Sequence, residues 1–343
     1  MRILALLFVF SASLALVARP SHSQDYDVVI AGSDTINSEL MPQLVETFAG
    51  TIPGGSYKLD PPTPTGLPIT ILQKGRKRLK VNVLSEGSLA GFKALLAGKA
   101  DIVTSSDRYT DEEIRQFQSL TGINLRTLER EHVIALDGLT IVINRQNPLF
   151  GRVFTLEEIA GIFSGRINFW SQLGGQKRRI NIYARNQVSG THRHFRIKVL
   201  DPYGYDFDAR TRFLGSSAEV REAVENDVDG VGFIGGSHVG LNNHALTIRS
   251  PCGLIHRPDE FSVLTQAYPL SRRLYIYTAT EPAHPDGRAL LNYIMRDRHA
   301  RGVIYNSGFI DQVIYFEWPD QEQFWIESCL LYTSDAADDL LCV

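Results

Sequence analysis

Short apolar runs alternate with longer amphipathic stretches along most of the chain. The apolar runs Val28–Ile30, Val81–Leu84 and Ile102–Thr104 predict strands, because each is short, rich in β-branched residues and followed by a polar break. In the stretches that follow them, apolar residues recur every three or four positions, as in helices. These stretches are 36–49, 89–98 and 110–120. Strands that alternate with helices predict an α/β fold.

Two of the expected helices carry a sequence that marks their first turn. Thr110 with Glu113, and Thr155 with Glu158, have the spacing of a capping box. In this motif the side chain of each residue accepts a hydrogen bond from the backbone N–H of the other. The segment Pro53–Pro68 is rich in proline and glycine, so we expect an exposed loop there.

The overall charge gives no reason to expect a nucleic-acid partner. The chain has 343 residues, of which 43% are apolar and 21% charged, and its net charge is −3. This composition is typical of a globular protein of up to two domains. The basic run Lys74–Lys80 precedes an apolar run, so we expect a solvated strand or hairpin edge there.

The first residues predict export. Arg2 precedes the apolar stretch Ile3–Val17, which is too short to span a bilayer, and small polar residues follow it up to about Ser23. This order is typical of a signal peptide, here residues 1–23, and it predicts a periplasmic protein.

Three segments share one arrangement, in which glycine and hydroxyl residues lie between an apolar run and a helix. They are "AGSDTI" at 31–36, "SEGSLAGF" at 85–92 and "RNQVSGTHRHF" at 185–195. A helix start presents unpaired N–H groups and the positive end of the helix dipole, so each segment is a candidate anion site, although each alone also suits an ordinary cap. Asp107 adds a carboxylate at a strand end, where α/β proteins bind ligands. With Arg185, the set suits a small oxyanion that carries a proton.

Four longer segments resemble the phosphate-binding protein of the bacterial ABC phosphate importer, the PstS type. They are 86–113, 135–175, 180–195 and 268–278, within a resemblance that covers about Val28 to Tyr315. The resemblance implies an α/β type II periplasmic-binding fold with two lobes, a ligand cleft and two hinge crossings. We expect lobe one to contain 24–131 and 261–319, and lobe two to contain 132–260. It also implies non-catalytic binding of inorganic phosphate for an ABC permease, without a cofactor.

The resemblance assigns ligand contacts by position. The residues are Ser33, Thr35, Ile36, Ser88, Asp107, Arg185, Ser189, Gly190 and Thr191. Arg185 would contact two oxygens, the hydroxyls would donate, the backbone N–H groups of Ile36 and Gly190 would add donors, and Asp107 would accept the proton of hydrogen phosphate. The chain departs from the family at Gln187, where an acid commonly orients the arginine; this implies a less firmly held Arg185.

Three alternatives to a transport phosphate binder stay open: a hydrolase, a binder of another oxyanion, and a phosphate binder or sensor without a transport role. A hydrolase would need a nucleophile elbow, which "QVSGT" lacks. His192 and His194 are two residues apart on a helix and point to different sides, so we expect no metal there. A binder of sulfate, molybdate or tungstate would have no use for the carboxylate of Asp107. An envelope-tethered phosphate binder or sensor without a transport role is the third alternative.

The end of the chain differs in composition from what precedes it. The segment "CLLYTSDAADD", 329–339, looks like a translated sequencing adapter, so we expect 329–343 to be non-native; a real acidic tail is the alternative. The region before it resembles the variant of the family that is followed by an OmpA-like domain, which would bind peptidoglycan. Without the tail Cys252 is the sole cysteine, and we interpret it as a buried apolar residue.

Overall fold

The computed structural model describes residues 25–64, 66–250, 252–311, 313–315 and 325–327. The expected signal peptide and the expected non-native tail lie outside this part of the chain. None of the helices in the described part combines the length and the apolar character that a membrane crossing requires.

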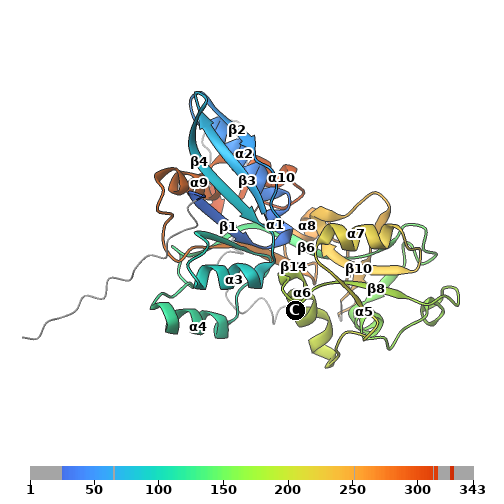
Figure 1. Cartoon of the computed structure of the whole chain (residues 1–343). Coiled ribbons are helices and arrows are strands. Elements are labelled where there is room, and N and C mark those ends of the chain that lie inside the picture. Colours follow the sequence, from blue (N-terminus) through green and yellow to red (C-terminus); the bar gives the residue numbers. More distant parts are fainter. Residues whose placement is uncertain (1–24, 65, 251, 312, 316–324, 328–343) are drawn as a thin grey trace, which may run out of the picture.

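One sheet of eleven strands runs through both halves of the molecule (Figure 1). Its order is β2-β3-β4-β1-β5-β14-β6-β10-β8-β9, and β11 pairs with β6. The strands are β1 (Val28–Gly32), β2 (Gly55–Leu59), β3 (Gly66–Gln73), β4 (Arg76–Leu84), β5 (Ile102–Ser105), β6 (Glu131–Asn144), β8 (Asn181–Arg185), β9 (Arg212–Leu214), β10 (Gly230–Gly235), β11 (Asn243–Ala245) and β14 (Ser271–Tyr277). Smaller sheets contain β7 (Val153–Thr155), β12 (Thr247–Arg249) and β13 (Ile255–His256), and β15 (Val313–Tyr315) with β16 (Trp325–Glu327).

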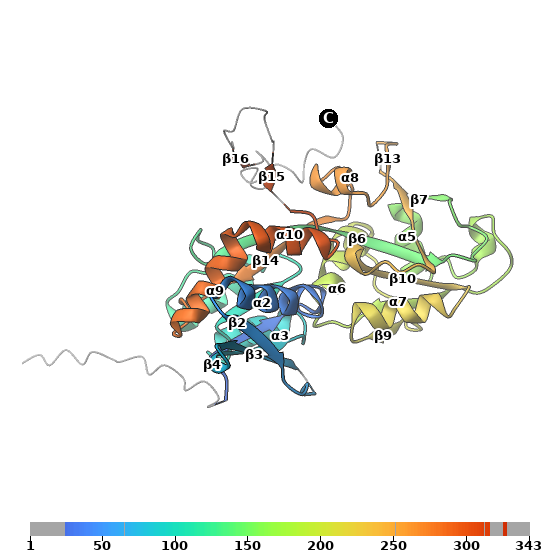
Figure 2. The ribbon, with the colours of Figure 1, turned by 90° about the horizontal axis from the view of Figure 1, so that it is seen from above.

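Helices cover both faces of this sheet in each half. They are α1 (Asp34–Asn37), α2 (Leu40–Thr51), α3 (Ser88–Leu96), α4 (Asp111–Thr121), α5 (Leu156–Phe163), α6 (Gly190–Phe195), α7 (Ser217–Glu225), α8 (Glu260–Leu264), α9 (Pro285–Arg296) and α10 (Arg298–Asn306). In the first half, α2, α9 and α10 lie side by side on one face (Figure 2), and α3 and α4 cover the other. Neighbouring residues of β1 point to the two faces: Ile30 packs with the first set and Ala31 with the second.

The second half has its own core. Residues of β6, β10, α5 and α6, such as Phe163, Phe195 and Phe233, pack in one cluster, and α7 packs on the opposite face through Val220 and Val224. The two halves are the two lobes of the expected fold.

The lobes meet along two antiparallel strands, β6 and β14. On β6, Ala135 packs in the core of lobe one and Leu136 in that of lobe two. Ile134 and Ala135, which we expected in lobe two, pack in the core of lobe one. Conversely, part of the segment that we expected in lobe one belongs to lobe two: Val263, Tyr268 and Leu270 are buried in its core, and Leu264 and Ile310 pack against it. The reason is that α8 covers lobe two before the chain returns along β14.

Several local predictions can be compared with the structure. Both capping boxes form, at Thr110 and Thr155, and the basic run lies in the β3–β4 hairpin. The prediction of a loop over 53–68 was wrong in part, because Gly55–Leu59 pairs with β3 as an exposed edge strand. The helix expected over 36–49 is two helices, α1 and α2, which are separate elements.

Candidate functional site

The three segments rich in glycine and hydroxyl residues, and Asp107, meet between the lobes. Lobe one contributes α1, the start of α3 and the end of β5, and lobe two contributes the turn from β8 into α6. Thr35 Oγ1 of lobe one lies 3.2 Å from Thr191 Oγ1 of lobe two. The backbone N–H of Leu89 donates to the carbonyl of Val188 at 3.2 Å. The two lobes therefore touch at the residues that the sequence singles out.

Arg185 is the last residue of β8, and its side chain is 1% exposed. Nη1 donates to Asp34 Oδ2 at 3.0 Å and to Ser217 Oγ at 2.8 Å, and Nη2 donates to the carbonyl of Gly215 at 2.9 Å. Nε is buried and makes no hydrogen bond within the described chain. Since a guanidinium has five N–H donors, Nε–H and one N–H of Nη2 remain for a ligand. Burial lowers the pKa of Arg185, and the charge of Asp34 opposes that shift.

We expected Gln187 to leave Arg185 loosely held, because the family commonly has an acid at that position. In the structure, three hydrogen bonds to other residues hold the guanidinium. Gln187 is exposed, and the acid that contacts the guanidinium is Asp34 of the opposite lobe. Asp34 stands in one of the segments that the sequence analysis singled out, but no local pattern links it to a residue 151 positions later.

The turn into α6 is held by its own side chains. Ser189 caps the helix, since its Oγ accepts from the N–H groups of Thr191 at 3.1 Å and His192 at 3.4 Å. A serine oxygen that accepts in this way can still donate its hydrogen. Ser189 is therefore positioned by the cap and keeps one donor.

Gly190 permits the close approach of the lobes. A Cβ atom at this position would lie 2.5 Å from Ser88 Oγ and 2.6 Å from Ser106 Oγ, both in lobe one. Ser88 Oγ also accepts from the backbone N–H of Ser106 at 3.2 Å. Only a residue without a side chain fits between these hydroxyls as they stand.

Ser33 and Ile36, at the start of and within α1, differ in the hydrogen-bond donors that they can give to a ligand. The Ser33 hydroxyl is buried without a hydrogen-bond partner in the described chain, so it is available to a ligand. The Ile36 side chain lies in the core of lobe one, which leaves its backbone. The N–H of Ile36 already donates to the carbonyl of Ser33 at 3.2 Å, so a ligand would have to share this donor.

Asp107 contacts α6 from lobe one. Its Oδ2 accepts from Arg193 Nε at 2.9 Å, and its Oδ1 lies 3.5 Å from His194 Nδ1. Burial alone would raise the pKa of Asp107, but the hydrogen bond and charge of His194, together with Arg193, outweigh burial and lower it. The carboxylate is therefore ionised at neutral pH, and it retains lone pairs because each oxygen accepts more than one bond.

Arg272 is a second buried arginine that sequence reasoning missed. It lies on β14, and its Nε and Nη2 donate to Asp137 Oδ2 at 2.9 and 2.6 Å. Its Nη1 donates to Thr191 Oγ1 at 2.8 Å. The segment "YPLSRR" contributed only to the resemblance, since nothing local indicates that Arg272 reaches α6.

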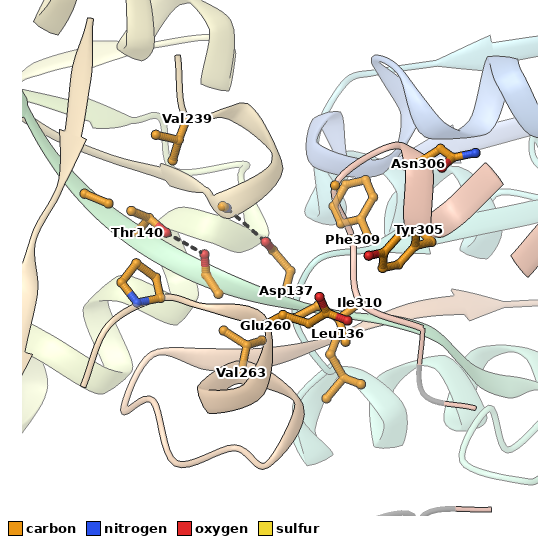
Figure 3. Close-up of a pocket in the computed structure, with 15 residues that line it drawn as sticks. Leu136, Asp137, Thr140, Val239, Glu260, Val263, Tyr305, Asn306, Phe309 and Ile310 are labelled. Carbon is orange, nitrogen blue, oxygen red and sulfur yellow. Dashed lines mark hydrogen bonds between the residues drawn. The ribbon is translucent and has the colours of Figure 1, made fainter. Parts of the chain in front are cut away.

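A cavity of about 560 Å³ lies at the hinge, apart from the predicted residues (Figure 3). Tyr305 and Phe309 of lobe one face Val239 of lobe two across it. Asp137 also reaches it, with Oδ1 accepting from the N–H of Gly236 at 2.9 Å. The nine predicted site residues do not line this cavity.

The histidine nearest to Ser189 in sequence is not placed as its base. Ser189 Oγ accepts from two backbone N–H groups, and His192 Nδ1 pairs with the carbonyl of Arg185 at 2.8 Å instead of with this serine. Burial lowers the pKa of His192. Within the described residues, no group of three or more His, Cys, Asp or Glu side chains could hold a metal ion. The expectation of a buried Cys252 was wrong: it is exposed, with Sγ 3.1 Å from Ser250 Oγ.

Known proteins resemble this chain in sequence and in fold. Residues 21–298 match the family model of the PBP superfamily domain. The phosphate-binding proteins PstS of Pseudomonas aeruginosa and Staphylococcus epidermidis are each 26% identical to it, over 60% and 64% of this chain. The match spans 66% of the length of each relative.

Solved structures agree with the fold. A Clostridium perfringens protein with bound phosphate superposes with a TM-score of 0.65 at 21% identity, covering 83% of this chain and 98% of that one. An ABC-type phosphate transport receptor from Vibrio cholerae gives 0.58 at 23% identity, covering 82% and 99%. The predicted type II fold is confirmed. Since the family model matches well over half of its length, the chain belongs to the PBP superfamily.

Proposed function

We propose that the protein binds inorganic phosphate in the cleft between its lobes and catalyses no reaction. The observation that carries this proposal is Arg185, buried with its Nε–H unused in the described chain. The hydroxyls of Thr35 and Thr191, from opposite lobes, lie 3.2 Å apart, and the buried hydroxyl of Ser33 stands just before the same helix, α1. An arginine that keeps an unused N–H, between the same two lobes as these hydroxyl donors, suits an oxyanion, and contact to both lobes lets the anion favour the closed arrangement.

Asp107 favours phosphate over a fully ionised anion. Its lowered pKa keeps the carboxylate ionised at neutral pH, so it can accept the proton of hydrogen phosphate. Sulfate has no proton at this pH and would face a carboxylate without a bond to it, which costs affinity.

We further propose that the protein serves an ABC phosphate importer from the periplasm. The names of its relatives and of its structural neighbours support this role. A peptidoglycan-binding domain after the binding module stays a prediction, which resequencing of the locus with a different library chemistry would test. A neighbouring permease gene would favour transport over a sensor role.

Titration calorimetry on mature protein stripped of ligand tests phosphate binding. Arg185→Ala should raise the Kd for phosphate about 100-fold, because a hydrogen bond to a charged group contributes about 1.5–3 kcal/mol and at least one is lost. Arg249→Ala removes an exposed arginine of β12 and serves as the matched control. It should leave the Kd unchanged.

Three results would contradict the proposal. Stripped protein that gives no heat with phosphate would exclude phosphate as the ligand. Heat with sulfate, molybdate or tungstate in its place would favour the other oxyanions. Release of product from a chromogenic phosphoester would revive the hydrolase alternative.

A further inference from the structure

Asp34 is an acid of lobe one whose carboxylate lies among polar groups of lobe two. It begins α1 and is 7% exposed. Its Oδ2 accepts from Arg185 Nη1 at 3.0 Å and from the backbone N–H of Ser217 at 3.1 Å. Both donors belong to lobe two, so this one oxygen joins the lobes through two hydrogen bonds.

The groups around Asp34 are those expected to hold an anion. Ser217 is the first residue of α7, a helix of nine residues, whose start carries the positive end of the helix dipole. Arg185 adds a full charge. The carboxylate of Asp34, from lobe one, therefore lies where the start of α7 and Arg185, both of lobe two, stabilise a negative charge.

The contact also determines which N–H groups of Arg185 stay available. Asp34 and Ser217 occupy Nη1, and the Gly215 carbonyl occupies one N–H of Nη2. The guanidinium is thereby fixed with Nε unused in the described chain. Of these three partners, only Asp34 comes from lobe one, so separation of the lobes would break this contact and leave the other two.

We propose that Asp34 is a positioning residue that couples closure of the lobes to the orientation of Arg185. This inference rests on the proposed binding of phosphate at Arg185. Asp34 orients the guanidinium in the closed arrangement alone, so the anion meets its cation fully oriented only when the lobes have closed. A carboxylate that merely repelled the anion would have the opposite effect on affinity.

A double-mutant cycle on phosphate binding separates these roles. Asp34→Asn keeps the shape of the side chain and removes its charge; we expect the Kd for phosphate to rise about tenfold, as for one charge-assisted hydrogen bond. In an Arg185→Ala background the same change should leave the Kd unchanged or lower it, because no guanidinium remains to be oriented. Phosphorus NMR titration reaches the weak binding of these variants.

Glu113→Gln is the matched control, because it also removes an acid that bonds across the cleft. Glu113 accepts from Arg193 Nη1 at 2.9 Å and has no contact with Arg185. Glutamine keeps the capping box of α4. We expect a smaller change in Kd than for Asp34→Asn and no dependence on Arg185. An equal change would mean that any lost contact between the lobes has this effect, which would overturn the inference.

Solution scattering adds a measurement that does not depend on phosphate, and the Kd values distinguish failure of this inference from failure of phosphate binding. Without added phosphate, Asp34→Asn should have a larger radius of gyration than the wild type, since a contact that closes the lobes is lost. Wild type that binds no phosphate would overturn the proposed function and, with it, the coupling to the anion. Phosphate binding with an unchanged Kd in Asp34→Asn would overturn the inference alone.

Discussion

Three arginines of the cleft are each paired with an aspartate. The pairs are Arg185 with Asp34, Arg193 with Asp107, and Arg272 with Asp137. Arg193 and Arg272 donate Nε to their carboxylate, whereas the Nε of Arg185 makes no bond in the described chain. Arg185 is therefore the one of these three arginines whose Nε–H is unused by the described chain. The pairing matters because a buried charge without a partner is costly.

The role of Asp107 in selectivity can be tested by one substitution. Asp107→Asn replaces the acceptor with an amide that can also donate, so it should improve sulfate relative to phosphate by about tenfold, the size of one bond to a charged group. It also weakens the contact with Arg193 and His194, but that loss affects closure around either anion equally and cancels in the ratio.

Competition of labelled phosphate by sulfate, in wild type and variant, measures the ratio. An unchanged ratio would mean that Asp107 serves α6 and does not face the ligand.

Local sequence patterns predicted elements well where the structure depends on near neighbours. The capping boxes of α4 and α5 formed because each involves residues three apart. The strand Gly55–Leu59 was missed because its extended conformation depends on backbone pairing with β3, and its own sequence has no strand pattern. In the cleft, the β8–α6 turn was found from its own residues. Asp34 and Arg272 could not be, because their partners are 151 and 81 positions away.

The start of α6 offers a test of how closely the lobes approach. Gly190 is helical, so alanine suits its backbone, but the added Cβ would lie 2.5 Å from Ser88 Oγ. Overpacking costs about 1–3 kcal/mol, and here it falls on the closed arrangement. We therefore expect Gly190→Ala to raise the Kd for phosphate about 10- to 100-fold.

Gly302→Ala is the control for this substitution. Gly302 lies in α10, and a Cβ there would meet nothing within 4 Å. Alanine should stabilise the protein by up to about 1 kcal/mol through helix propensity and leave the Kd unchanged. Calorimetry on both variants makes the comparison; equal Kd values for wild type and Gly190→Ala would show that the approach of the lobes tolerates a methyl group.

At the scale of the molecule, the lobes are parts of one sheet joined along β6 and β14. The register of these strands shifts between Leu274 and Tyr275, close to the boundary between the two cores at Ala135. A shift of this kind bends a strand locally, so the hinge has a structural basis where the cores separate. Arg272 and Asp137 are directly opposite each other in the same pair of strands.

We expect both the stability of the protein and phosphate binding to depend on this ion pair at the hinge. Arg272 and Asp137 have side chains only 1% exposed. Arg272→Met should lower the free energy of unfolding by about 3–5 kcal/mol, because it leaves a buried carboxylate without its cation. Adding Asp137→Asn removes that charge and should restore much of the stability, which urea unfolding measures.

Phosphate affinity should respond differently from stability in these two variants. Arg272 Nη1 donates to Thr191 Oγ1, a proposed ligand hydroxyl, and the second substitution does not return this donor. The double variant should therefore regain stability while its Kd stays raised, about tenfold above wild type. Recovery of both would mean that Arg272 acts on the cleft through stability alone. An unchanged urea midpoint in Arg272→Met would contradict the burial of the pair. It would also contradict the inference that Arg272, on a hinge strand, is a buried cation next to the proposed ligand residue Thr191.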